Sequence, residues 1–334
     1  MPAITVEDTT ALKRLPQVAQ QVRQRPVRQV TEAPKGYEGE GFPVRRAFAG
    51  VDLSDLDPFI HLDQIGEVNY CPGDPKGTPW HPHRGFETVT YMMDGVIQHA
   101  DSIGGGGVIR DGATQWMTAG KGILHIETPP PDVVAAGGWF HGVQLWVNLP
   151  SSKKWVDPRY QDVEADLVEV VTTPDADTVL RVIAGPLGEF TGPGSTHSPI
   201  SMVHGTFSPG SRAVIPWPAE FNCLVYVFGG RGYVGAERRP VRTGNLTVLG
   251  PGDAFIVEAD DDQDTRTGGM EVLFLGGQPL REPVAWAGPF VMNSDAEVRQ
   301  AFEDFQRGVL GEIPRDHPLA PTNEVVAETD SPLD

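Results

Sequence analysis

The fold of this chain is decided by two stretches of its sequence, His81-Pro82-His83-Arg84-Gly85-Phe86-Glu87 and Gly120-Lys121-Gly122-Ile123-Leu124-His125-Ile126-Glu127. Each contains two good metal ligands two residues apart: His81 with His83, and His125 with Glu127. Residues i and i+2 of a β-strand point to the same face, so each pair can direct both side chains at one point. Two such strands facing each other inside a barrel predict a metal held by three histidines and one glutamate.

The types of ligand restrict the metal. Imidazole and carboxylate groups suit Fe(II), Mn(II), Ni(II) or Zn(II). The lack of thiolate ligands argues against a structural zinc site, which usually contains cysteine. An octahedral ion with four protein ligands keeps about two positions for water, O₂ or a chelating substrate. We therefore expect a redox-active or Lewis-acid centre.

Glu87 is a second candidate for the carboxylate. It follows His83 by four residues, and on an ideal strand it would share that face. We prefer Glu127 as the ligand because it pairs directly with His125, which leaves Glu87 as a supporting residue or a base. Arg84 is expected to form either a charge pair near the site or an ordinary surface ion pair.

The rest of the chain indicates an all-β protein with two related halves. Its 334 residues exceed what one core usually needs, and its 39 glycines and 31 prolines favour short strands joined by turns. Strand patterns such as Thr88–Met92 and Leu224–Phe228 occur in both halves, but only the first half has the His-x-His and His-x-Glu pairs. We therefore predict two related barrels, of which one holds a metal.

These patterns divide the chain into four parts. Residues 1–40 are polar and interrupted by prolines, which predicts a flexible N-terminal arm. Residues 41–160 form the metal-binding barrel, and residues 161–311 form the second barrel and a short helix. That helix is predicted from Asp295 to Gly308, with Ser294 or Asp295 as its N-cap. Residues 312–334, acidic and rich in proline, are predicted to be a disordered tail.

The composition excludes several classes of protein. With 26 basic and 45 acidic residues the formal charge is −19, which disfavours direct binding to nucleic-acid phosphates. No apolar run is long enough to span a bilayer, and the N-terminus does not resemble a secretory signal, so we expect no membrane association. Cys71 and Cys223 are predicted to be buried free thiols, which fits a reducing, cytoplasmic location.

Six further histidines lie outside the two ligand pairs. His99 and His141 lie on predicted strands, where a hydrogen-bonded core or pocket histidine is the expected role. No role is assigned to the other four, which are His61, His197, His204 and His317.

The sequence around the metal ligands resembles the pirin family, whose members are two-barrel (bicupin) proteins of the cupin superfamily. The resemblance covers about Phe42 to Gly311 and is densest in His81–Tyr91, Gln115–Gly120, Gly122–Glu127, Gln144–Pro150 and Gly288–Asn293. It implies two antiparallel cupin β-barrels face to face, with iron in the N-terminal one. The family's ligands fall on His81, His83, His125 and Glu127, the same four that the spacing selects.

This chain departs from the family pattern in places. Residues before about 40 and after Gly311 are extra, and Gly120 stands where the wider cupin motif has proline. The glutamate of the first cupin motif, Glu87 here, is not the pirin ligand, which again favours Glu127.

The resemblance implies two different functions. The first is a quercetin 2,3-dioxygenase-like oxygenase that cleaves a flavonol with O₂ at Fe(II), although Mn, Ni, Cu and Zn fit the same ligands. Glu127, or Glu87, would be the base, and Phe86, Val89 and Trp116 would line the pocket if a cavity is present. The second is an iron-dependent redox co-regulator that binds a transcription factor or a metabolic enzyme. A third hypothesis is a bicupin that acts on a different chelating substrate. Under each of the three hypotheses we expect the protein to be a monomer.

Overall fold

The N-terminal half of the chain forms an antiparallel barrel from two facing sheets. The computed structural model describes residues 6, 8–19 and 21–313. The larger sheet of this barrel has seven strands, in the order β13 (Arg159–Val163), β10 (Thr114–Thr118), β7 (Phe86–Asp94), β12 (Gly138–Asn148), β5 (Phe59–Tyr70), β4 (Phe42–Arg46) and β3 (Lys35–Glu38). The smaller sheet has four, in the order β6 (Thr78–His83), β11 (Ile123–Thr128), β8 (Ile97–Asp101) and β9 (Gly106–Ile109).

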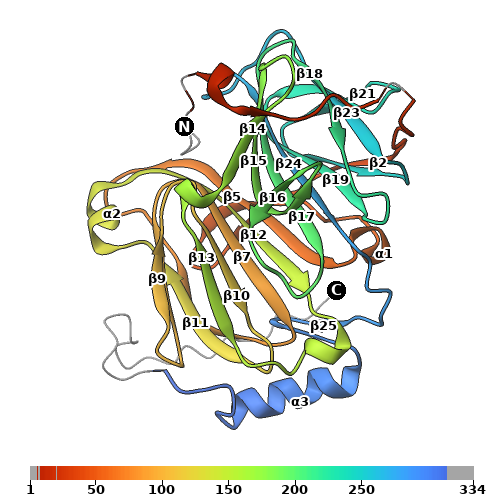
Figure 1. The fold of residues 1–334 in the computed structure, drawn as a ribbon. Coiled ribbons are helices and arrows are strands. Elements are labelled where there is room, and N and C mark those ends of the chain that lie inside the picture. Colours follow the sequence, from red (N-terminus) through yellow and green to blue (C-terminus); the bar gives the residue numbers. More distant parts are fainter. Residues whose placement is uncertain (1–5, 7, 20, 314–334) are drawn as a thin grey trace.

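The second half repeats this architecture (Figure 1). Its larger sheet has the order β1 (Lys13–Arg14), β14 (Glu169–Thr172), β15 (Thr178–Leu187), β17 (Ile200–Phe207), β24 (Met270–Gly277), β19 (Cys223–Gly229), β22 (Asn245–Leu249) and β2 (Val27–Glu32), and β16 (Phe190–Pro193) pairs with β15. The smaller sheet has the order β18 (Arg212–Pro216), β23 (Ala254–Ala259), β20 (Arg231–Val234) and β21 (Arg239–Arg242). The predicted all-β fold with two cupin barrels is therefore confirmed.

Short elements connect and cover the two barrels. They are the helices α1 (Leu53–Leu56), α2 (Pro131–Ala136) and α3 (Asp295–Gln306), the 3₁₀ turns Thr9–Ala11, Ser151–Lys153 and Ala165–Leu167, and the hairpin of β25 (Ala285–Ala287) and β26 (Phe290–Met292). Helix α3 confirms the predicted C-terminal helix, and the Ser294 side chain caps it by accepting a hydrogen bond from the Glu297 amide. In the described part of the chain, no helix has the length and apolar character needed to cross a membrane.

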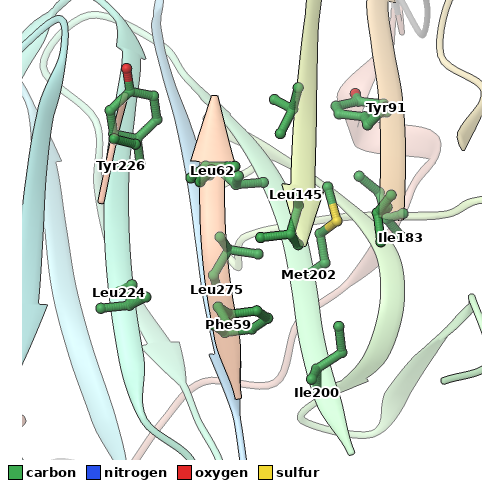
Figure 2. Packing of buried hydrophobic residues seen from close by; sticks show 14 of the residues in the cluster. Phe59, Leu62, Tyr91, Leu145, Ile183, Ile200, Met202, Leu224, Tyr226 and Leu275 are labelled. Carbon is green, nitrogen blue, oxygen red and sulfur yellow. The ribbon is translucent and has the colours of Figure 1, made fainter. Parts of the chain in front are cut away.

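The two barrels pack together through their larger sheets. Figure 2 shows this shared core, in which Phe59, Leu62 and Leu145 from the first barrel meet Met202 and Leu275 from the second. Burying one such side chain stabilises the fold by about 1.5–3 kcal/mol. Because β7 is covered on both sides, all nine of its residues are buried, and its alternation divides them between the interior of the first barrel and this shared core.

The N-terminal stretch predicted to be a flexible arm is instead built into the sheets, so that prediction was wrong for the described residues. Strand β2 pairs with β22 of the second barrel, whereas β3 pairs with β4 of the first. Arg25, only 2% exposed, donates hydrogen bonds to the carbonyl oxygens of Pro218 and Gly250. The prolines end strands here, and Val27–Glu32 between them has enough β-forming residues to add to a sheet edge. The predicted disordered tail, 312–334, lies almost wholly outside the described residues.

The C-terminal segment follows the second barrel in the sequence but packs on the N-terminal barrel. Figure 1 shows α3 below that barrel, far from the second one. Arg84 is 2% exposed; its guanidinium contacts an Asp304 carboxylate oxygen of α3 at 2.8 Å and donates to the Lys121 carbonyl oxygen. Arg84 thus forms a buried ion pair beside the site, the first of its two expected roles.

A buried lysine, Lys154, holds the hairpin of β25 and β26 against the first barrel. Lys154 is 0% exposed, and its Nζ donates hydrogen bonds to the carbonyl oxygens of Gly85 and Val291 and to Asn148 Oδ1, at 2.7–2.8 Å. These acceptors come from the turn before β7, from β26 and from the end of β12. Burial lowers the pKa of Lys154 to about 8. One ammonium group therefore joins the C-terminal hairpin to the loop that carries His83 and Arg84.

Both cysteines are free, but only Cys223 is buried; Cys71 is exposed, so the prediction of two buried thiols was half wrong. Burial also raises the pKa of Cys223, which further lowers its reactivity. We expect one thiol per native chain to react rapidly with a disulfide reagent such as DTNB, and a second to react only after unfolding in guanidinium chloride. Cys71→Ser should abolish the rapid phase and Cys223→Ser the slow one; two rapid thiols in the native protein would contradict this assignment.

Candidate metal centre

Strands β6 and β11 bring three histidines together. The two strands pair antiparallel with His125 opposite His81 and Ile123 opposite His83. One ring nitrogen from each of His81, His83 and His125 lies within 4.8 Å of the other two, and the Nε2 atoms of His81 and His125 are 2.8 Å apart. Three imidazoles whose nitrogens converge in this way have the geometry of a metal-binding face.

Backbone carbonyl groups orient two of these rings. His81 Nδ1 lies 2.8 Å from the Pro79 oxygen, and His83 Nδ1 lies 3.4 Å from the Pro289 oxygen. A carbonyl oxygen only accepts, so each Nδ1 carries the proton and each Nε2 keeps a lone pair. Pro289 belongs to the hairpin of β25 and β26, so the C-terminal segment helps to build a site in the N-terminal barrel.

Burial also sets the protonation of the three histidines. His83 and His125 are 3% and 2% exposed. Burial lowers the pKa of His81, and burial together with the neighbouring rings lowers those of His83 and His125 well below the usual value. The rings are therefore neutral at pH 7, which is the form that binds metals.

Glu127 lies in the same pocket but stands apart from the three gathered nitrogens. A β-bulge separates it from His125 in the pairing with β6. Its carboxylate accepts hydrogen bonds from Thr90 Oγ1 at 3.0 Å and from Gln144 Nε2 at 3.1 Å, and burial raises its pKa to about 7. Both partners are neutral, so this buried carboxyl has no hydrogen-bonded cation in the described chain. Three neutral imidazoles and such a carboxyl fit a divalent metal ion.

Two of the convergent histidines, His81 and His83, line a pocket of about 430 Å³ together with Glu127. Phe42, Ile65, Trp146 and Trp286 supply its apolar walls, and Trp286 comes from the C-terminal hairpin. A volume in the range of about 300–1,000 Å³ with mainly apolar walls is typical of sites for small organic molecules.

The walls differ from those expected from the sequence. Phe86 packs beside the site, with its ring 5.0 Å from that of His83, but Val89 and Trp116 lie in the core between the barrels. Successive residues of β7 alternate between the two faces, so Thr90 faces Glu127 while Val89 faces the second barrel.

Glu87 lies on the Val89 face of β7, away from the pocket. Its carboxylate accepts a hydrogen bond from Thr118 Oγ1 at 2.7 Å, and it is 0% exposed. The expected shared face with His83 does not arise because β6 ends at His83 and β7 begins at Phe86. Gly85 between them has a φ of +90°, and a Cβ there would lie 2.0 Å from the Val291 oxygen, so this turn requires glycine.

Several other histidines have polar partners. His99 contacts Gln115, and His141 Nε2 lies 2.8 Å from Gln64 Nε2, so both are buried and hydrogen-bonded as expected. His197 is a partly exposed loop residue, and His317 lies outside the described residues.

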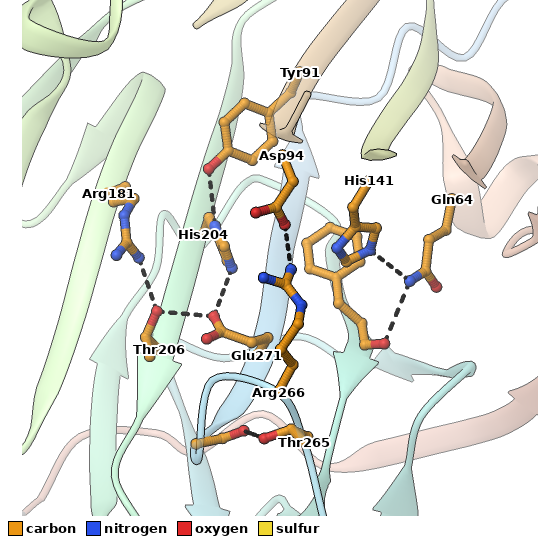
Figure 3. A network of polar contacts seen from close by, with 12 residues as sticks. Gln64, Tyr91, Asp94, His141, Arg181, His204, Thr206, Thr265, Arg266 and Glu271 are labelled. Carbon is orange, nitrogen blue, oxygen red and sulfur yellow. Dashed lines mark hydrogen bonds and ion pairs between the residues drawn. The ribbon is translucent and has the colours of Figure 1, made fainter. Parts of the chain in front are cut away.

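His204 belongs to a polar network between the barrels, which Figure 3 shows. Its Nδ1 lies 2.9 Å from the hydroxyl of Tyr91, and its Nε2 lies 2.9 Å from a carboxylate oxygen of Glu271. Because Tyr91 comes from the first barrel and the other two from the second, this network helps to align the two barrels.

A second cluster of metal-binding residue types, Glu67, Asp94 and His141, lies beside that network. Arg266 occupies it, because its guanidinium donates a hydrogen bond to the carboxylate of Glu67 and another to that of Asp94. Figure 3 shows the contact with Asp94. The positive charge that a metal would supply is therefore already present, and this cluster is better described as an ion-paired contact between the barrels.

The sequence interpretation missed His61. It lies on β5, lines the metal pocket, and its Nε2 is 3.1 Å from Asp63 Oδ2. The spacing His61-Leu62-Asp63 carries the same i, i+2 signal as the ligand pairs. Trp286 could not have been found in this way, because only the folding of the C-terminal segment brings it to the pocket.

Comparison with known proteins agrees with the fold and the motifs. Residues 41–147 match the family model for pirin, and residues 202–311 match that for the pirin C-terminal cupin domain. Human pirin is 37% identical over 278 residues, which cover 82% of this chain and 90% of that protein.

Solved structures show the same fold. The crystal structure of a quercetin 2,3-dioxygenase from Acinetobacter baumannii has a TM-score of 0.81 and 37% identity, covering 87% of this chain and all of that one. Bacterial pirin YhhW from Escherichia coli, in complex with nickel(II), is 20% identical with a TM-score of 0.52, covers 75% of this chain and all of that one, and shares the fold. By both of its domains, this chain is a member of the pirin family.

Proposed function

We propose that this protein is a mononuclear metal oxygenase of the quercetin 2,3-dioxygenase type, which acts on flavonols or similar chelating aromatic compounds. The observation that carries the proposal is the set of three neutral, convergent imidazoles, two of which, those of His81 and His83, line a 430 Å³ pocket with aromatic walls. The quercetin 2,3-dioxygenase from A. baumannii, 37% identical, supports the choice of substrate class.

In this proposal His81, His83, His125 and Glu127 hold the metal, with Fe(II) as the first choice. A divalent ion at this position would supply a Lewis acid and a redox centre for reaction with O₂. Two of the three imidazoles, those of His81 and His83, are already oriented by the Pro79 and Pro289 carbonyl groups, so they need little ordering when the ion binds.

The protein's own residues would hold the substrate and move its proton. Trp146 and Trp286 lie 6.0 Å apart at a 62° angle and give a planar aromatic molecule two rings to pack against. Glu127, placed by Thr90 and Gln144, is the carboxyl group that this proposal assigns as acceptor of a proton from a hydroxyl beside the metal. The apolar walls would exclude water from the reacting atoms.

The test is the consumption of O₂ with quercetin by protein loaded separately with Fe(II), Mn(II) or Ni(II). We expect turnover with at least one metal, and a loss of at least 100-fold in kcat/KM for His81→Ala. His197→Ala, which changes a loop histidine outside the pocket, should keep the full rate. Metal-loaded protein that consumes no O₂ with any flavonol would reject the enzyme proposal and favour the non-enzymatic co-regulator.

A further inference from the structure

The pocket contains a second histidine–carboxylate pair that the proposed reaction has not used. His61 and Asp63 follow each other at i and i+2 on β5, so both side chains point into the pocket while Leu62 points into the core between the barrels. The His61 side chain is 21% exposed, and the Asp63 side chain is 5% exposed. His61 thus offers a polar group at an otherwise mainly apolar wall.

Asp63 favours one tautomer of His61. The 3.1 Å contact joins His61 Nε2 to a carboxylate oxygen, whose negative charge favours a proton on Nε2 over a lone pair directed at the carboxylate. His61 Nδ1 then carries a lone pair, and it has no hydrogen-bond partner among the described residues. Arg46 and Glu38 also line this pocket, and they form an ion pair with each other.

A chain of rings gives the position of His61 relative to the metal ligands. The ring centroid of Trp146 lies 5.3 Å from that of His83 and 5.3 Å from that of His61. Trp286 of the hairpin packs against His61 as well, with a centroid distance of 6.2 Å. His61 therefore lines the same pocket as His81 and His83 and packs against two indole rings.

We infer that His61 selects the substrate: it accepts a hydrogen bond from a phenolic hydroxyl of the aromatic substrate that is not one of its metal-chelating oxygens. The inference rests on the proposed function, because it assigns a specificity group in the same pocket. A site that hydrogen-bonds a substrate hydroxyl discriminates strongly against the analogue without it, because its own polar group is then left unpaired. The substrate class narrows from chelating aromatics to polyhydroxylated ones.

The test compares quercetin with 3-hydroxyflavone, which keeps the chelating oxygens and lacks the other hydroxyls. We would measure binding to the metal-loaded protein by calorimetry under nitrogen, and kcat/KM in air. The wild-type protein should prefer quercetin by at least tenfold in both measurements. His61→Phe keeps a ring between Trp146 and Trp286 and should bind 3-hydroxyflavone as before while losing the preference.

Two further variants sharpen the result. Asp63→Asn removes the negative charge that favours a proton on His61 Nε2 but keeps the imidazole, so we expect a smaller loss of preference than in His61→Phe. His197→Phe should leave the preference unchanged. An equal preference in wild type and His61→Phe, or no preference in either, overturns this inference alone, whereas failure of the wild type to bind either flavonol overturns the proposed function as well.

Discussion

His125→Ala is expected to lower the affinity for the divalent metal by at least 100-fold. His125 is at the centre of the cluster: its ring centroid is 4.2 Å from that of His81 and 4.9 Å from that of His83. It is also buried on a central strand, so neither water nor a neighbouring side chain can replace the lost nitrogen easily. In comparable sites, replacing a residue that only orients a metal ligand already lowers metal affinity by about 10–100-fold.

The measurement is elemental analysis of protein purified without added metal, followed by titration against a chelator of known affinity. The wild type should retain about one metal per chain, as expected for a single site. His197→Ala is the matched control, and circular dichroism would show that His125→Ala keeps its strands. Full metal content in folded His125→Ala would exclude the site described here.

Lys154→Met is expected to lower the free energy of unfolding by about 3–5 kcal/mol. Methionine fills much of the same volume but cannot donate, so the oxygens of Gly85, Val291 and Asn148 lose the ammonium that satisfies them. Each buried acceptor left without a donor costs about 1–3 kcal/mol. Because the group is 0% exposed, water cannot take its place without opening the structure.

Urea unfolding monitored by tryptophan fluorescence would measure this loss. Lys153→Met is the control, since Lys153 is the exposed neighbour on the same turn and should change stability by less than about 0.5 kcal/mol. We also expect weaker metal binding in Lys154→Met, because the freed hairpin carries the Pro289 carbonyl that orients His83. Equal stability of the two variants would show that the lysine contributes nothing through these three contacts.

The parts of the molecule that the sequence could predict are those with local signals. The i, i+2 pairs His81 with His83 and His125 with Glu127 predicted a cluster of four ligands. The structure gathers the three histidine nitrogens, whereas Glu127 lies outside that group. Ser294 capped its helix as its residue type predicts. The face on which Glu87 lies was harder to predict, because a turn at a single glycine separates two strands that look continuous in the sequence.

Other features depend on contacts between distant segments, which no local pattern encodes. Trp286 and Pro289 reach the metal pocket only because the C-terminal hairpin crosses to the first barrel. Residues 27–32 looked like part of a polar arm because their partner, β22, is more than two hundred residues away in the chain. The i, i+2 spacing of His61 and Asp63 can be seen in the sequence. Whether that pair lies in a site depends on which face of β5 opens into the pocket, and the sequence does not show this.

The exchange of terminal segments between the barrels has a consequence for how the molecule is made. The carbonyl that orients His83 belongs to Pro289, which is synthesised 206 residues later. The first barrel is therefore synthesised before the carbonyl group that orients His83, whereas β2 of the second barrel is synthesised before the rest of that barrel. If the three histidines bind a metal as proposed, the complete site forms only after Pro289 has been synthesised.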